Sequence, residues 1–181
     1  HPQDPPPEEL QSIINLYTQG QMQQALSESN RMLERFPNSA ALHNIAGGSN
    51  TALMQIDAAI ESYKRALQIK PDSAAIYNNM GNALNDKGDP EAAIACYKQA
   101  LIIKPDYAQV YNNMGATLNG KGNHEAAIDS FKQALKIKPE YAEAHNNMGN
   151  ALKDKGELEA AIDSFKQALK INPNYAEAYN N

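Results

Sequence analysis

Residues 74–107 read AAIYNNMGNALNDKGDPEAAIACYKQALIIKPDY, and this stretch of 34 residues decides the fold because it recurs along the chain. Residues 108–141 and 142–175 repeat it closely, and residues 6–39 and 40–73 repeat it more loosely. A fixed period in this range is typical of proteins built from stacked helical units. We therefore predict five units in residues 6–175, after a Pro-rich extended or processed leader at 1–5 and before the start of a truncated sixth unit at 176–181.

Each unit carries the pattern of two helices joined by a turn. Apolar residues recur at helical spacing from Ile76 to Leu84, and again from Ala93 to Ile103. Gly88 permits the turn between the two segments, and Pro105 ends the second one. The sequence therefore predicts an all-α protein in which every unit is an antiparallel helix pair.

The repeated unit resembles the tetratricopeptide repeat, and the resemblance covers most of the chain. Positions are counted here from the first residue of each unit, so that Ala74 is position 1. The resemblance implies a right-handed α-solenoid of stacked helix pairs, in which the first helices line the concave side. It rests on a large residue at position 4 (His43, Tyr77, Tyr111, His145), Gly at position 8 (Gly47, Gly81, Gly115, Gly149), Ala at position 20 (Ala25, Ala59, Ala93, Ala127, Ala161), an aromatic residue at position 24 (Tyr63, Tyr97, Phe131, Phe165), Ala at position 27 (Ala66, Ala100, Ala134, Ala168) and Pro at position 32 (Pro37, Pro71, Pro105, Pro139, Pro173).

The first two units depart from this pattern. The first has Ile13 at position 8, Ser29 at position 24 and Met32 at position 27. The second has Met54 at the turn, where the other units have Gly. We expect both units to pack less regularly than the later ones.

Composition excludes several classes of function. The net charge is −5, and the chain has only three arginines, so no basic surface for nucleic acid is indicated. No apolar run approaches membrane-spanning length, and the amino-terminal residues lack the apolar core of a signal peptide. These features favour a cytoplasmic location. The single Cys96 excludes an internal disulfide.

Asparagines recur at the positions that the family turns inward, chiefly 5, 6 and 9. The resemblance implies that these side chains form a ladder along the concave surface, similar to that of the repeats in O-linked N-acetylglucosamine transferases, where asparagines hold peptide backbone. Each amide can both donate and accept a hydrogen bond, so a row of them can bind an extended peptide through its backbone. Alternatively, one Asn of each pair bonds the adjacent repeat. The predicted peptide-binding residues are Asn44, Asn78, Asn79, Asn82, Asn112, Asn113, Asn146, Asn147 and Asn150.

The charges at these positions also indicate the kind of partner. Repeats of this family that clamp acidic carboxyl termini use Lys or Arg at position 2, where this chain has Ala75, Gln109 and Glu143. Asp86 and Asp154 add negative charge at position 13. We therefore expect the partner to be a protein or peptide segment that is extended and neutral to mildly basic.

A second surface is predicted near the carboxyl-terminal end. The sequence stops inside the sixth unit, so we expect the second helix of the fifth unit to be only partly covered, and exposed apolar residues at the end of a solenoid are a site for association. The residues predicted for self-association are Ile162, Phe165, Leu169, Ile171, Tyr175 and Tyr179.

Catalysis has little support in the sequence. No His, Cys or carboxylate cluster has the spacing of metal ligands, and no nucleophile has a base beside it, so we expect neither cofactor nor metal. His43 and His145 replace Tyr at position 4 and are predicted to be packing residues. The sequence thus predicts a non-catalytic scaffold that binds an extended peptide. The alternatives are a self-assembly module and the substrate-docking arm of a larger enzyme such as a glycosyltransferase.

Overall fold

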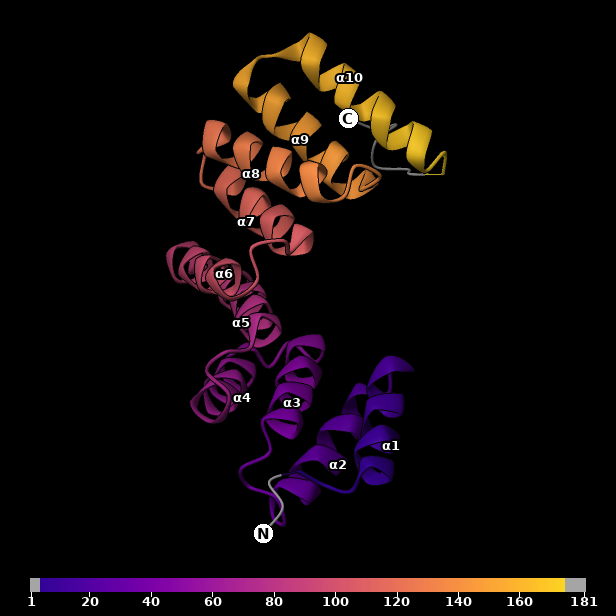
Figure 1. Ribbon diagram of the computed structural model, residues 1–181, viewed down its shortest axis with the longest axis vertical. Coiled ribbons are helices and arrows are strands. Elements are labelled where there is room, and N and C mark those ends of the chain that lie inside the picture. The colour runs from indigo at the N-terminus through magenta and orange to yellow at the C-terminus, as the bar shows by residue number, and fades with distance from the viewer. Residues whose placement is uncertain (1–3, 175–181) are drawn as a thin grey trace. The chain divides into compact units, whose positions relative to one another are not determined.

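The computed structural model describes residues 4–174, and within them every regular element is an α-helix (Figure 1). The first helices of successive repeats from α3 onward begin 34 residues apart, in agreement with the sequence period. The helices are α1 (Pro7–Thr18), α2 (Met22–Leu33), α3 (Ala40–Ala52), α4 (Ile56–Ile69), α5 (Ala74–Lys87), α6 (Pro90–Ile103), α7 (Ala108–Gly120), α8 (His124–Ile137), α9 (Ala142–Lys155) and α10 (Leu158–Ile171). The predicted all-α solenoid is confirmed. The expected start of a sixth unit at 176–181, together with Tyr175 and Tyr179, lies outside the described residues.

The chain divides into two compact units, residues 1–92 and 93–181, and the division falls inside α6. The first unit holds α1 to α5, and the second holds most of α6 together with α7 to α10. Each unit has its own core, so each is described separately below.

Turns between paired helices depend on a left-handed backbone conformation. Gly88 ends α5 with φ +85°, and its N–H and that of Asp89 donate to carbonyls of the last turn of the helix. A residue without Cβ adopts this conformation at little cost. Met54 occupies the same place after α3 and adopts φ +58°, although it carries a side chain.

The cores consist of aromatic rings packed against small residues. In the second unit, Phe131 and Phe165 are buried with Ala127, Ala151 and Ala161. A Cβ added at Gly115 would lie 2.7 Å from the ring of Phe131, so position 8 must stay small for the two helices to approach. In the first unit, Gly47 has the same relation to Tyr63, at 2.5 Å.

The first repeat reverses this arrangement of large and small residues. It has Ile13 at position 8 and Ser29 at position 24, and both are fully buried. The contact between α1 and α2 is less extensive than that between α3 and α4, as predicted for this repeat. For residues 40–73 the prediction of less regular packing is wrong, because α3 and α4 contact each other as extensively as α9 and α10 do. Met54 preserves the turn by adopting the conformation that Gly has elsewhere.

The leader is not simply extended away from the repeats where it is described. The hydroxyl of Ser39, which precedes α3, donates to a carboxylate oxygen of Asp4, and Pro5 is buried. Pro7 then begins α1 at a position where its missing N–H is not needed.

Candidate peptide-binding surface

The predicted asparagines divide into two classes according to how deeply their side chains are buried. Those at position 5 of repeats 3 to 5 are buried: Asn78, Asn112 and Asn146 are only 1–3% exposed. Those at positions 6 and 9 are half-buried, as is Asn44 of repeat 2. The half-buried set is Asn44, Asn79, Asn82, Asn113, Asn147 and Asn150. Within each unit we call the asparagines at positions 5, 6 and 9 the Asn face of that unit; they lie on α3 and α5 in the first unit and on α7 and α9 in the second.

In the second unit, hydrogen bonds connect the Asn face from one repeat to the next. Asn147 on α9 donates its Nδ2 to Oδ1 of Asn112 on α7, at 3.1 Å. Asn112 in turn donates its Nδ2 to Oε1 of Glu143, at 2.9 Å. Glu143 and Asn147 stand one turn apart on α9, so the buried amide of Asn112 bridges two side chains of the following repeat.

In the first unit, the corresponding pair lacks the carboxylate. Asn79 on α5 donates its Nδ2 to Oδ1 of Asn44 on α3, at 3.2 Å. The residue at position 2 of this repeat is Ala75, which cannot accept a hydrogen bond through its side chain. The same Asn–Asn bond therefore occurs with one partner fewer than in the second unit.

These hydrogen bonds indicate that the asparagine at position 5 stabilises the contact between successive repeats. A hydrogen bond between neutral groups contributes about 0.5–1.5 kcal/mol to stability, and one to a charged group about 1.5–3 kcal/mol. Because Asn112 is buried, leaving its amide without partners would carry a desolvation cost. Asn112, and by its burial its counterparts Asn78 and Asn146, thus belong to the interior of the repeat array, whereas position 6 reaches the surface.

A second set of polar contacts follows the other end of α7 and α9. Asn119 donates its Nδ2 to Oδ2 of Asp154, at 2.8 Å. The Oδ1 of Asn119 lies 2.7 Å from Nδ1 of His124, so this nitrogen carries the proton and donates. The sequence identified Glu143 and Asp154 only as negative charges. Their separations of 31 and 35 residues from their asparagines, close to one repeat, are the signal that places them side by side.

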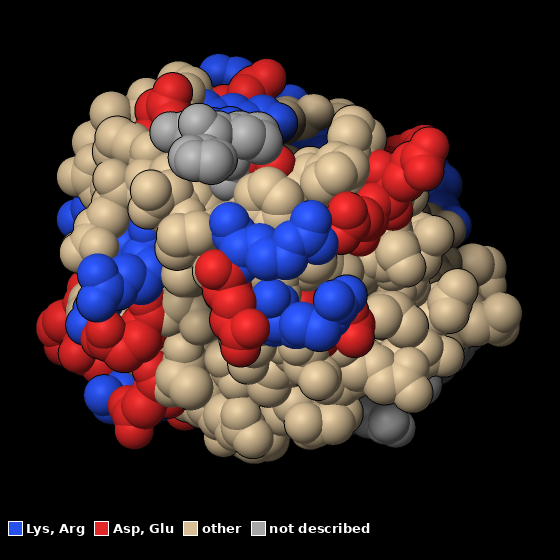
Figure 2. Space-filling view, turned by 90° about the horizontal axis from the view of Figure 1, so that it is seen from below, with Lys and Arg blue, Asp and Glu red and all other residues tan. Residues whose placement is uncertain are grey.

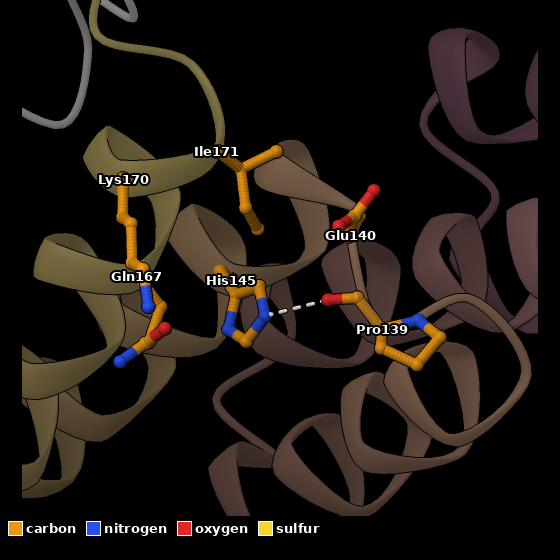
Figure 3. A pocket seen from close by; sticks show the side chains of 6 residues that line it. All are labelled: Pro139, Glu140, His145, Gln167, Lys170 and Ile171. Atoms are coloured by element: carbon orange, nitrogen blue, oxygen red, sulfur yellow. Dashed lines mark hydrogen bonds between the residues drawn. The ribbon is translucent and has the colours of Figure 1, made fainter.

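The position 4 histidines bind the turn that precedes their helix. In the depression of about 300 Å³ drawn in Figure 3, His145 donates its Nε2–H to the carbonyl of Pro139, at 3.0 Å. His43 makes the equivalent bond to the carbonyl of Pro37, at 2.9 Å. Nδ1 of His145 is buried without a hydrogen-bond partner among the described residues. The imidazole rings of His43 and His145 therefore hydrogen-bond their helices, α3 and α9, to the preceding turns in addition to packing.

The residues predicted for self-association divide by exposure. Ile162 is 52% exposed, whereas its counterparts Ile60 and Ile128 are 5% exposed, because each of those packs against the first helix of the following repeat. Leu158, one turn before Ile162, is also exposed. Leu169 and Ile171 are half-buried. Phe165 does not belong to this surface, since its ring is buried against Gly149 in the core.

Residues 4–174 carry neither a metal site nor a membrane span. No group of three or more His, Cys, Asp or Glu residues in this part of the chain could hold a metal ion. None of the described helices is long and apolar enough to cross a membrane. On the face shown in Figure 2, Lys and Arg side chains lie among Asp and Glu side chains and form no extended basic surface.

Comparisons with known proteins agree with this architecture. Family models described as tetratricopeptide repeat match residues 72–140 and 142–175, and a third, described as TPR repeat, matches residues 52–88. None of the curated proteins is close enough in sequence to count as a relative.

Solved structures with the same fold cover nearly the whole chain. A structure of MamA is 26% identical, with 90% of this chain and 95% of that chain covered and a TM-score of 0.79. A structure of pilF from Pseudomonas aeruginosa is 21% identical, with 94% and 78% covered and a TM-score of 0.84. YrrB, described as a TPR protein with an unusual peptide-binding site, is 19% identical, with 95% and 89% covered and a TM-score of 0.75.

Proposed function

Because the chain belongs to the tetratricopeptide repeat family, whose members generally mediate protein–protein interaction, we propose that it is a non-catalytic scaffold that binds an extended peptide segment on its Asn face. One observation carries this proposal. At position 6, Asn79 and Asn147 each use one polar atom of the side-chain amide within the repeat array, while the other polar atom has no partner among the described residues and is not buried.

The choice of Asn at position 6 supports the proposal because Asn is poorly suited to a helix. Each Asn lowers helix stability by roughly 0.5–0.7 kcal/mol relative to Ala. One hydrogen bond between repeats offsets that cost, but the second polar atom of each side-chain amide is accessible and takes no part in the contacts between repeats. A bound ligand could form hydrogen bonds with these second atoms. The description of YrrB as peptide-binding is consistent with this function in a protein of the same fold.

The partner is expected to be an extended polar segment that carries no strong negative charge. Glu143 and Asp154 lie beside the asparagines of the second unit, and both are exposed. An acidic segment would meet like charge there, whereas a neutral or mildly basic segment would not. An extended strand also presents its own N–H and C=O groups, which a side-chain amide can match.

A direct test uses peptides selected for binding from a random library of short linear sequences displayed on phage. Affinities of the selected peptides are measured by calorimetry for the parent chain and for the double variant Asn113→Ala/Asn147→Ala. We expect the double variant to lose at least about tenfold in affinity, because each lost hydrogen bond contributes about 1 kcal/mol. Helical circular dichroism and its melting curve report whether the fold is retained.

A matched control separates the Asn face from asparagine in general. Asn123 is exposed in the turn before α8 and makes no capping bond with its side chain. The variant Asn123→Ala should bind the selected peptides as the parent does. If the double variant Asn113→Ala/Asn147→Ala folds and binds the selected peptides with unchanged affinity, the proposal is wrong.

The exposure of Ile162 favours a second function, self-association through the face of α10 that carries Ile162. Light scattering over a concentration series would show a mass that rises above the monomer value of 19.8 kDa. The variant Ile162→Ser should lower the mass toward that value. Ile102→Ser is the control, since Ile102 is 71% exposed on a different helix and should not change the mass. A constant monomer at all concentrations would exclude this function.

A further inference from the structure

The carboxylate of Glu143 fixes the direction of the hydrogen bonds that cross the second unit. An ionised carboxylate can only accept, so the atom of Asn112 at 2.9 Å from Oε1 must be its NH₂ group. The Oδ1 of Asn112 is then the atom that faces Asn147, at 3.1 Å. Asn147 must therefore donate its own NH₂ group, and its Oδ1 is the atom left over.

This remaining oxygen is available to a ligand. Asn147 is half-buried, and its Oδ1 has no hydrogen-bond partner among the described residues. This oxygen is not buried, so it reaches solvent. The second oxygen of Glu143 lies one turn away on an exposed side chain. Both groups accept hydrogen bonds, and neither can donate one.

At the other end of α9, a carboxylate again fixes the orientation of an asparagine amide. Asp154 accepts from Asn119, which in turn accepts from His124, so the amide of Asn119 has both of its polar atoms engaged. The exposed carboxylate of Asp154 again presents an acceptor. Lys153, at position 12 of the fifth unit, is a cationic residue next to Asp154 in sequence and about three turns from Glu143.

We propose that Glu143 is a positioning residue that turns the Oδ1 of Asn147 outward, so that Asn147 and Glu143 together select segments by their hydrogen-bond donors. The groups selected are the backbone N–H groups of an extended strand and the side chains of Lys and Arg. The inference rests on the proposed function of the Asn face and specifies the chemistry that it recognises.

The first unit provides an internal comparison. Ala75 stands where the fifth repeat has Glu143, and the Asn79–Asn44 bond has no carboxylate to fix its direction. If both amides of such a pair rotate together, donor and acceptor exchange without loss of the bond. The variant Glu143→Ala therefore gives the fifth repeat a residue that another repeat already carries at this position, and it should fold.

The test uses neutral peptides, so that the charge of Glu143 does not enter. One probe is an extended Ser/Ala peptide, and its match is a depsipeptide in which ester oxygens replace alternate backbone N–H groups. Binding is followed by NMR titration of the ¹⁵N-labelled chain. For the parent we expect the amide peptide to bind about tenfold more tightly than the depsipeptide, which corresponds to about one to two donated hydrogen bonds.

Three variants make the outcome decisive. In Glu143→Ala the preference for the amide peptide should fall toward equality, because Asn147 can then turn either atom outward. In Glu140→Ala, which removes an exposed carboxylate from the preceding turn, the preference should stay as in the parent. In Asn147→Ala both peptides should bind weakly.

The alternatives are distinguishable from one another. Equal affinity for the two peptides in the parent, with binding lost in Asn147→Ala, would overturn the role of Glu143 and leave the peptide-binding function standing. Binding that survives in Asn147→Ala would overturn both. An unchanged ¹H shift of the Asn112 side-chain NH₂ in Glu143→Ala would likewise contradict the proposed bond, whatever the peptides do.

Discussion

Gly115 lies so close to Phe131 that a Cβ built on it would stand 2.7 Å from Cε1 of the ring. A Cβ built on Gly149 would likewise stand 2.5 Å from the ring of Phe165, and one built on Gly47 would stand 2.5 Å from the ring of Tyr63. The ring is rigid and fully buried, so an added side chain has no flexible neighbour to displace. This pair of positions sets the distance between the two helices of a repeat.

Gly115→Leu is expected to destabilise the second unit. Overpacking of a dense core costs about 1–3 kcal/mol, and here the added atoms meet a buried ring. The melting temperature measured by circular dichroism should fall. Gly120→Ala is the control on the same helix, because no atom lies within 4 Å of an added Cβ there. An equal effect of both substitutions would show that the ring contact is not the cause.

Met54→Gly is expected to stabilise the first unit. Met54 has φ +58°, a conformation that costs a residue with a side chain about 1–2 kcal/mol. Its side chain is 78% exposed, so little packing is lost on removal. After the extra flexibility of Gly in the unfolded chain is subtracted, the gain should be about 0.5–1 kcal/mol in chemical denaturation. Met54→Ala keeps the strained backbone and should give no such gain.

Tyr63 should make the first unit sensitive to alkaline pH. Burial raises the pKa of Tyr63 from 10.0 to about 12, opposed in part by its hydrogen bond to Thr51. A raised pKa in the folded state means that stability is complete below pH 10 and falls as the pH rises toward 12, by on the order of 2 kcal/mol. Tyr63→Phe, the residue found in repeats 4 and 5, should reduce this loss. Urea midpoints measured between pH 9 and about pH 12 would show it.

Ser29→Ala is expected to raise stability. Ser29 is fully buried in α2, and its hydroxyl has no hydrogen-bond partner among the described residues. An unsatisfied buried polar group costs about 1–3 kcal/mol, and Ala removes it with almost no change of volume. Ser62→Ala serves as the comparison, because the hydroxyl of Ser62 donates to the carbonyl of Ala58 on a less buried surface. A lower urea midpoint for Ser29→Ala than for the parent would contradict the assignment.

The sequence was sufficient for the fold because its signals are local and repeated. The helix period, the Gly at the turn after Lys87 and the small and aromatic residues at fixed positions recur in register, so each copy supports the same interpretation. The strained turn at Met54 was also visible as a missing Gly.

The details of the site were less predictable because they depend on contacts between repeats. The sequence pattern does not distinguish a buried asparagine from an accessible one, yet Asn112 is buried and Asn147 reaches the surface. Glu143 counted only as a negative charge, although its oxygen decides which way a neighbouring amide points. Phe165 was expected at an exposed end, but its ring packs inward against the Gly of its own repeat.

The bond from Asn112 to Glu143 also has a consequence for alignment. Repeats that are nearly identical in sequence offer a ligand several equivalent placements, each shifted by one repeat. Among residues 4–174, Glu143 is the only carboxylate at position 2, and it removes that equivalence, since the pair Asn79–Asn44 has Ala75 beside it and the pair Asn147–Asn112 has Glu143. A strand that depends on this carboxylate would therefore be held at the second unit and not at the first.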